Sequence, residues 1–318
     1  MTSSFRRPRT ALPAVALLAA ALAVGCGHGT SGDTGGINAQ AAAVPTTATA
    51  SAGQSSAGST DGAFKDLEQH FGARLGVYAV DTGSGREVAY RPDERFAFAS
   101  TIKSLLTGAL LRTASDQELD KVVTYRQDEV LTWAPITSRH VDTGMKVRDL
   151  AAAALEYSDN TAANLLMTEL GGPEALQRTL RGLGDPTTNV NRNEPALNEA
   201  TPGDPRDTST PRAFATDLRR YVLGDVLTED RRRMLTDWMV GNTTGAPFIR
   251  AGVPADWKIG DKTGNGGYGT RNDVAVAWPS GGRSPVVLVL MSDRGTADAT
   301  SDDALIAEAT KAVVTALG

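Results

Sequence analysis

The sequence predicts a two-lobed α/β protein in which both ends of the chain form one antiparallel sheet with flanking helices, and the middle forms an inserted all-α lobe. Three observations lead to this fold class. Alternating apolar residues at 74–90 indicate a hairpin, helical apolar spacing dominates the middle of the chain, and strand patterns return over 256–291. Strands from the two ends would most economically pair with each other, and a ligand site is expected in the cleft between the lobes.

The predicted hairpin opens the folded region. Leu75, Val77 and Ala79 alternate along the first strand, turn residues fill 81–85, and 87–90 supplies the second strand. The apolar period then changes to that of a helix, first in the run that contains Ile102 and Leu105. Further helices are predicted within 146–157, 161–170, 173–183, 211–223 and 228–240.

Three strands and a helix close the predicted fold. The strands are expected at 256–262, 273–278 and 286–291, and the last is a continuous apolar run that suits a strand covered on both faces. In the terminal helix, Thr300 and Asp303 predict a capping box. The domain then comprises residues 61–318, with an α/β lobe of 61–95 and 248–318 and a helical lobe of 96–247.

Residues 1–26 have the pattern of an export signal, with arginines at the start, an apolar stretch over 11–24 and small residues before Cys26. The order Ala23-Val24-Gly25-Cys26 resembles a bacterial lipobox, which predicts that lipid on Cys26 anchors the protein to the outer side of the cell membrane. A plain cleaved signal followed by secretion is the alternative. Residues 27–60 are mostly Gly, Ala, Ser and Thr, which predicts a disordered tether.

Charge and composition argue against several other classes of protein. The 318 residues carry a formal charge of −5 and contain no dense run of Lys and Arg, which argues against nucleic-acid binding. Cys26 is the only cysteine, so neither an internal disulfide nor a cysteine-based zinc site is expected. His28, His70 and His140 lack the spacing of metal ligands. We therefore expect neither a metal nor a cofactor.

Ser100 and Lys103 form the first chemical motif. They lie where the helix containing Ile102 begins, three residues apart and thus on one face, so the lysine amine can reach the serine hydroxyl. Serine becomes an effective nucleophile when a neighbouring base takes its proton, and a helix N-terminus favours the developing negative charge. Taken alone, the same residues also suit a helix cap followed by a solvated lysine.

Two further motifs are informative only in combination with the first. Ser158-Asp159-Asn160 precedes a predicted helix and alone suits a cap, whereas Lys262-Thr263-Gly264 ends a predicted strand, where glycine lets a ligand approach the backbone. The three motifs, in this order, are the set found in class A β-lactamases and penicillin-binding proteins. Over essentially all of residues 61–318, the chain resembles the class A serine β-lactamases.

A fourth segment sharpens the resemblance. Residues 192–200 resemble the family's Ω-loop, in which a glutamate and an asparagine, here Glu194 and Asn198, hold the deacylating water. The resemblance also implies an ion pair between Arg192 and Asp207 at the neck of the loop.

The chain departs from its relatives at four positions. Asn193 stands where many relatives have Trp, and Asn265 stands where Ala, Ser or Thr is commoner. Ala99 and Gly266 occupy positions that hold paired cysteines in several carbapenem-hydrolysing relatives, so that disulfide is absent. These changes border the expected site without removing a catalytic group.

The resemblance implies hydrolysis of the β-lactam amide through a serine acyl-enzyme, which gives resistance to β-lactam antibiotics. Ser100 would attack, and either Lys103 alone or Glu194 through a water would take its proton. The backbone N–H groups of Ser100 and Asn265 would form the oxyanion hole, and Ser158 would pass a proton to the departing nitrogen. Glu194 would then activate water for deacylation.

The remaining site residues are expected to bind substrate. Lys262, Thr263 and Arg271 would hold the substrate carboxylate, and Trp133 resembles the aromatic residue at the cleft mouth in this family, although an ordinary half-buried tryptophan explains it equally well. The full expected substrate-binding set is Asn160, Asn198, Lys262, Thr263, Asn265, Arg271 and Trp133. We expect a monomer whose partners are small β-lactam molecules.

Two other functions stay open at this point. A D,D-peptidase or penicillin-sensing domain, acylated without turnover, shares the first three motifs, but the segment around Glu194 argues against it. A non-catalytic cell-wall-binding lipoprotein could use a degenerate scaffold, but the intact Ser100, Lys103, Ser158 and Lys262 argue against that reading.

Overall fold

The computed structural model describes residues 52–318, with side chains from residue 60 onward. The predicted export signal, its Cys26 and the part of the predicted tether from 27 to 51 lie outside the described residues. The described chain begins with helix α1, Ala52–Phe71. This corrects one expectation, because the folded region opens with a helix rather than a strand, and the helix includes residues 52–60 of the predicted tether.

Packing of its second half explains helix α1. Phe64 is fully buried, and Leu67 and Phe71 pack against the same core. Their spacing of three and four residues places all three on one helical face, a signal that the sequence prediction overlooked. Once this face is anchored, extending the helix toward its N-terminus is easier than nucleating it.

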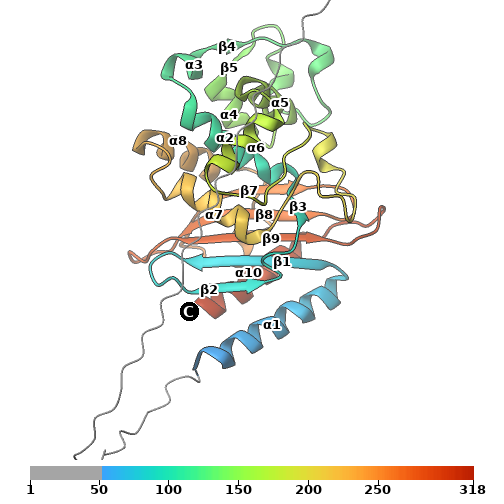
Figure 1. Cartoon of the computed structure of the whole chain (residues 1–318), viewed down its shortest axis with the longest axis vertical. Coiled ribbons are helices and arrows are strands. Elements are labelled where there is room, and N and C mark those ends of the chain that lie inside the picture. The colour runs from blue at the N-terminus through green and yellow to red at the C-terminus, as the bar shows by residue number, and fades with distance from the viewer. Residues whose placement is uncertain (1–51) are drawn as a thin grey trace, which may run out of the picture. The chain divides into compact units, whose positions relative to one another are not determined.

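A five-stranded antiparallel sheet has the strand order β2-β1-β9-β8-β7 (Figure 1). The chain ends meet in this sheet, because β1 pairs with β9 along its whole length, from Arg74 opposite Asp293 to Asp81 opposite Val286. The predicted sheet built from both ends of the chain is therefore confirmed. Its strands are β1 (Arg74–Asp81), β2 (Glu87–Tyr90), β7 (Lys258–Asn265), β8 (Arg271–Trp278) and β9 (Val286–Asp293).

Helices fill the chain between β2 and β7, as predicted. They are α2 (Ile102–Thr113), α3 (Asp116–Asp120), α4 (Val147–Glu156), α5 (Asn160–Leu170), α6 (Pro173–Gly182), α7 (Pro211–Val222), α8 (Glu229–Val240) and α9 (Ile249–Gly252), and α10 (Asp303–Leu317) follows the sheet. Short strand pairs join β3 (Phe96–Ala97) to β6 (Thr208–Ser209) and β4 (Val122–Val123) to β5 (Met145–Lys146). Within residues 52–318, none of the helices has the length and apolar character needed to cross a bilayer.

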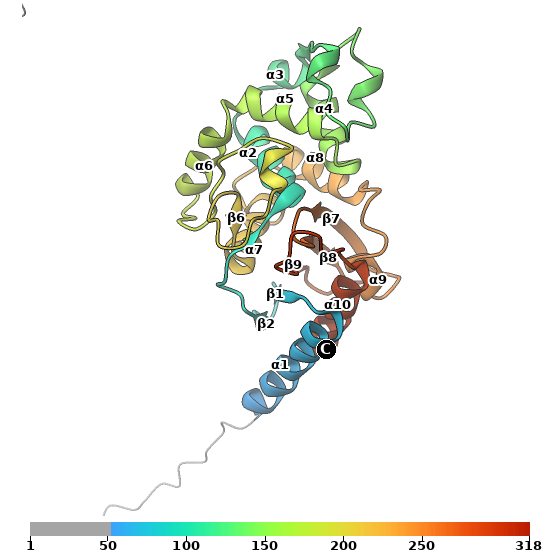
Figure 2. The same cartoon turned by 90° about the vertical axis from the view of Figure 1, so that its right-hand side faces the viewer.

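The two faces of the sheet carry different cores. Helices α1 and α10 cover one face, where Val77 and Leu288 point, whereas α7 packs on the other face with Val274 and Val287 and joins it to the helical lobe (Figures 1 and 2). Strand β9 is buried on both faces, which its continuous apolar sequence predicts. This arrangement leaves β7 as the sheet edge beside the helical lobe.

The ends of three elements differ from expectation. Strand β7 runs on to Asn265, so the Lys262-Thr263-Gly264 motif lies inside the strand, and β8 begins two residues early, at Arg271. The capping box predicted for Thr300 and Asp303 is wrong. Asp302 caps α10 instead and accepts a hydrogen bond from Ala304 N at 3.0 Å, while the Asp303 carboxylate is bound to Arg271.

Candidate active site

The predicted site residues converge on a cavity of about 460 Å³ between strand β7 and the helical lobe. The residues that line it are Ser100, Trp133, Ser158, Asn160, Asn198, Thr244, Phe248, Thr263, Asn265 and Arg271. Three more predicted residues, Lys103, Glu194 and Lys262, are almost completely buried and bond to this set. Thr244 and Phe248 are the lining residues that the sequence did not reveal.

Ser100 lies in a 3₁₀ turn, Ala99–Thr101, directly before helix α2. Ala99 adopts a left-handed conformation with φ of 48°, which is strained for a residue with a Cβ atom. The turn exposes 8% of Ser100 to the cavity, and Ser100 Oγ donates a hydrogen bond to Glu194 Oε1 at 2.9 Å. The hydroxyl therefore has a carboxylate positioned to take its proton.

Lys103 is buried one turn along α2. Its Nζ lies 3.0 Å from Glu194 Oε1, 2.8 Å from Ser158 O and 2.6 Å from Asn160 Oδ1. The sequence predicts that the Lys103 amine reaches the Ser100 hydroxyl; in the structure both groups contact the same oxygen of Glu194. Burial lowers the pKa of Lys103, and the Glu194 charge acts in the opposite direction.

Ser158 stands between two lysines. Its Oγ lies 3.0 Å from Lys262 Nζ and 3.3 Å from Lys103 Nζ, and its backbone is left-handed with φ of 56°. Burial, reinforced by the nearby charge of Lys103, lowers the pKa of Lys262 to about 7. A hydroxyl held by two amines of lowered pKa is well placed to relay a proton.

The loop that carries Glu194 is fixed from α5. Asn164 Nδ2 donates to Glu194 O at 2.8 Å, and Glu194 N donates to Asn164 Oδ1 at 2.9 Å. Asn198 Nδ2 bonds to the other carboxylate oxygen, Oε2. Sequence reasoning missed Asn164, although its position four residues after Asn160 places it on the same helical face.

The neck of the same loop is closed as the resemblance implied. Arg192 Nε lies 2.5 Å from Asp207 Oδ2, and Arg192 also pairs with Glu199. Asp207 is buried and further accepts hydrogen bonds from the backbone N–H groups of Asn191 and Arg192. The loop therefore has its own internal anchor in addition to Asn164.

Strand β7 passes close to the turn that carries Ser100. A Cβ atom on Gly264 would lie 2.9 Å from Phe98 O, so only glycine allows this approach without a shift of the backbone. The segments that carry Ser100 and Asn265 consequently meet at the cavity, where their backbone N–H groups are expected to form the oxyanion hole. Nearby, Thr263 Oγ1 and Thr244 Oγ1 are hydrogen-bonded at 2.6 Å.

Trp133 and Arg271 both line the cavity. Trp133 is 56% exposed, and its Nε1 donates to Tyr157 O at 3.1 Å. Arg271 pairs with Asn265 across β7 and β8, lies over the Phe248 ring, and donates from Nε to Asp303 Oδ1 at 2.5 Å. Arg271, which is expected to bind the substrate carboxylate, is therefore already paired with the carboxylate of Asp303.

Replacement of Arg271 tests its role in binding substrate. A hydrogen bond to a charged group contributes about 1.5–3 kcal/mol, so Arg271→Ala should lower kcat/KM for penicillins by roughly 10- to 150-fold. Because the Arg271–Asp303 pair is partly exposed, the melting temperature should hardly change. Steady-state kinetics within about twofold of wild type would show that Lys262 and Thr263 hold the carboxylate alone.

The assembled groups suit acyl transfer to an anionic substrate. The site offers a serine hydroxyl bonded to a carboxylate, a second hydroxyl between two lysine amines, and two cationic side chains, Arg271 on the cavity wall and the buried Lys262. Within residues 52–318, no group of three or more His, Cys, Asp or Glu side chains is arranged to hold a metal ion.

Comparisons with known proteins agree with this chemistry. A model of the "Beta-lactamase enzyme family" matches residues 60–317. The chain is 56% identical over 255 residues to a β-lactamase of Amycolatopsis lactamdurans, covering 80% of this chain and 84% of the relative. It is 54% identical over 254 residues to a β-lactamase of Bacillus licheniformis, covering 80% and 82%.

Solved structures give the same result. A class A β-lactamase from Clostridium kluyveri matches with a TM-score of 0.80 and 47% identity, over 81% of this chain and 98% of that one. A halotolerant bacterial β-lactamase matches with a TM-score of 0.79 and 53% identity, over 80% and 98%.

Proposed function

The chain belongs to the class A β-lactamases and hydrolyses β-lactams, which gives resistance to these antibiotics, and from this premise we propose which residue performs each step of the reaction. One observation carries the proposal. Glu194 Oε1 lies 2.9 Å from Ser100 Oγ and 3.0 Å from Lys103 Nζ, so one carboxylate oxygen contacts both the nucleophile and a buried cation.

In acylation, Ser100 Oγ attacks the β-lactam carbonyl and Glu194 takes its proton. The direct hydrogen bond between the two side chains supports this choice over Lys103, whose amine instead holds Glu194 and Ser158 in place. The backbone N–H groups of Ser100 and Asn265 stabilise the anion on the carbonyl oxygen. As the C–N bond breaks, Ser158 protonates the ring nitrogen and takes a proton from Lys103, which receives the proton that Glu194 took from Ser100, so that Glu194 is again a carboxylate.

In deacylation, Glu194 takes a proton from a water molecule that attacks the ester carbonyl. Asn198 and Asn164 hold the carboxylate and its backbone, so the base keeps its position after the serine has been esterified. Ser100 then leaves with a proton and the enzyme is regenerated. A penicillin-sensing domain would need no such base, so this arrangement supports turnover.

Hydrolysis of a chromogenic cephalosporin tests the assignment of Ser100. The wild-type protein should turn over, and Ser100→Ala should lose at least about 10³-fold in kcat because no covalent intermediate can form. Ser104→Ala is the matched control, since this buried serine on the same helix bonds only to Thr101 O. Stoichiometric acylation without turnover in the wild type would instead indicate a penicillin-sensing protein.

We further propose that the protein is exported and held on the outer side of the cell membrane by lipid on Cys26. The signal-like sequence before Cys26 supports this location. Radioactive palmitate should label the wild-type protein in a bacterial host, and Cys26→Ser should abolish both labelling and partition into detergent. An exported protein that starts after Cys26 and carries no lipid would indicate secretion.

We also propose that the enzyme acts as a monomer, because Ser100, Lys103, Ser158 and Glu194 already contact one another within one chain and the proposed reaction requires no residue from a second copy. Light scattering of the purified protein would measure the mass directly.

A further inference from the structure

We propose that Asn272 is a positioning residue that fixes the position of Ser100 N–H relative to Asn265 N–H, the two donors of the oxyanion hole. The inference rests on the proposed function, because it concerns how the same site stabilises the anion formed on the substrate carbonyl. Asn272 is fully buried in β8 and is not among the residues that line the cavity. It can therefore act only through the segments that it holds.

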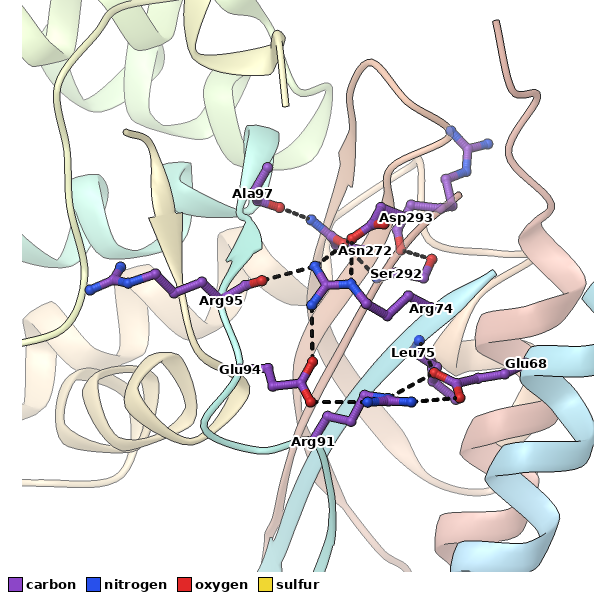
Figure 3. A network of polar contacts seen from close by, with 11 residues as sticks. Glu68, Arg74, Leu75, Arg91, Glu94, Arg95, Ala97, Asn272, Ser292 and Asp293 are labelled. Carbon is purple, nitrogen blue, oxygen red and sulfur yellow. Dashed lines mark hydrogen bonds and ion pairs between the residues drawn. The ribbon is translucent and has the colours of Figure 1, made fainter. Parts of the chain in front are cut away.

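The Asn272 carboxamide joins three segments of the chain (Figure 3). Its Nδ2 donates to Ala97 O at 2.8 Å, while its Oδ1 accepts from Ser292 N at 3.1 Å. Nδ2 also donates to Phe98 O at 3.1 Å. Both amide protons and the carbonyl oxygen are thus used. One side chain fastens strand β8 to strand β9 and to the segment that precedes the nucleophile.

The segment held by Nδ2 leads directly into the first oxyanion-hole donor, Ser100 N–H. Ala99 stands between Phe98 and Ser100 and is left-handed, a conformation that persists only where its surroundings enforce it. On the far side of Ala99, Thr101 N and Thr101 Oγ1 donate to Phe98 O at 3.2 and 2.6 Å. From outside the turn, Asp207 O accepts a hydrogen bond from Phe98 N at 3.2 Å, and the bonds from Asn272 join the segment to strand β8, which sets where the strained turn lies relative to the sheet.

The second donor, Asn265 N–H, is tied to Asn272 through the strand ladder. Asn272 lies opposite Gly264, and the next pair is Arg271 opposite Asn265. Ser292 adds a further bond, from its Oγ to Arg271 O at 2.6 Å. The position of Asn265 relative to Ser100 is therefore set by two links: the pairing of Asn272 with Gly264, and the bonds from Asn272 to Ala97 O and Phe98 O.

The residue type at this position supports a specific role. Asparagine is unfavourable in strand interiors, and the next strand positions after Asp273 are the apolar Val274 to Ala277. A second tie near the same place comes from Arg74, which bonds Arg95 O at 2.9 Å and Asp293 at 2.6 Å (Figure 3). That contact is made four residues before Ala99, whereas Asn272 bonds Phe98 O, directly before Ala99, and Ala97 O, one residue earlier.

Asn272→Leu tests the proposal, because leucine has a similar size and no hydrogen-bonding atoms. Displacement of reacting groups by about 1 Å can cost on the order of 10²-fold, so kcat/KM should fall about 10- to 100-fold. The inhibition constant of a boronic acid transition-state analogue should rise by a similar factor. In the Glu194→Gln background, the acyl-enzyme carbonyl should absorb at higher infrared frequency, because its oxygen accepts weaker hydrogen bonds.

Two control measurements distinguish a positioning role of Asn272 from an effect on the stability of the protein. Val313→Ala, in the core between α10 and the sheet, should lower the melting temperature without changing the inhibition constant or the carbonyl frequency. Penicillin affinity measured with Ser100→Ala should be the same with and without Asn272→Leu. A folded Asn272→Leu protein with kcat/KM and inhibition constant within about twofold of wild type would overturn the proposal.

Asn272→Asp keeps the test decisive if the leucine variant does not fold. Aspartate retains the acceptor for Ser292 N but can donate toward Ala97 and Phe98 only when protonated. Its kcat/KM relative to wild type should therefore fall as pH rises, and a ratio independent of pH would count against the proposal. Failure of the proposed function would look different, since the wild type and Val313→Ala would also show no turnover.

Discussion

Glu194→Gln should accumulate a covalent adduct on Ser100 that breaks down about 10²- to 10⁴-fold more slowly than in the wild-type enzyme, the usual contribution of a general base. Glutamine keeps the shape and the contact with Asn198 but cannot take a proton from water. Acylation should slow less, because Lys103 lies beside Ser100 and burial has lowered the pKa of its amine, which makes it an alternative base.

Mass spectrometry after mixing with a good penicillin substrate should show the intact protein plus one opened substrate. Glu174→Gln is the matched control, since Glu174 is an exposed residue on α6. This control should turn over normally and show no adduct. Unchanged steady-state turnover of Glu194→Gln would refute the assignment of Glu194 as the deacylating base.

Lys103→Met should lose at least about 10³-fold in kcat/KM at neutral pH. The change removes the cation that contacts Glu194, Ser158 and Asn160, and it leaves the Glu194 carboxylate buried without its cationic partner. Because these contacts are made to the proposed base and proton relay rather than to the substrate, kcat should fall as well as kcat/KM.

Steady-state kinetics of the two enzymes on the same penicillin measure this loss. Lys121→Met is the control, because Lys121 is an exposed lysine whose amine pairs with Glu169. A Lys103→Met enzyme with kcat and kcat/KM within about twofold of wild type would show that neither Glu194 nor Ser158 depends on the lysine.

Local sequence patterns predicted most of the fold. The hairpin of β1 and β2, the helices of the middle region and the doubly covered β9 each follow from a repeat within one segment. Helix α1 was missed because its apolar face is formed by only three residues, Phe64, Leu67 and Phe71, after a stretch of small residues. The ends of β7 and β8 were misplaced because pairing across the sheet, which local periodicity does not record, extends both strands.

The site residues that the sequence predicted belong to local motifs, whereas those that it missed contact residues distant in the sequence. Ser100, Ser158 and Lys262 were found because each belongs to a short motif. Asp303 was missed because it meets Arg271 only through folding, across 32 residues of sequence. Asn272 was missed for the same reason, since its partners Ala97 and Ser292 lie 175 and 20 residues away.

The pairing of β1 with β9 has a consequence for the time at which the enzyme becomes active. Arg74 and Asp293 are 219 residues apart, and contacts of such separation make folding slow, because a long loop must close before they form. Helix α2 and its serine can form early, but β1 gains its neighbour only when β9 is available. A nascent chain that ends before Val286 carries every proposed catalytic side chain and lacks the strand to which Asn272 is bonded.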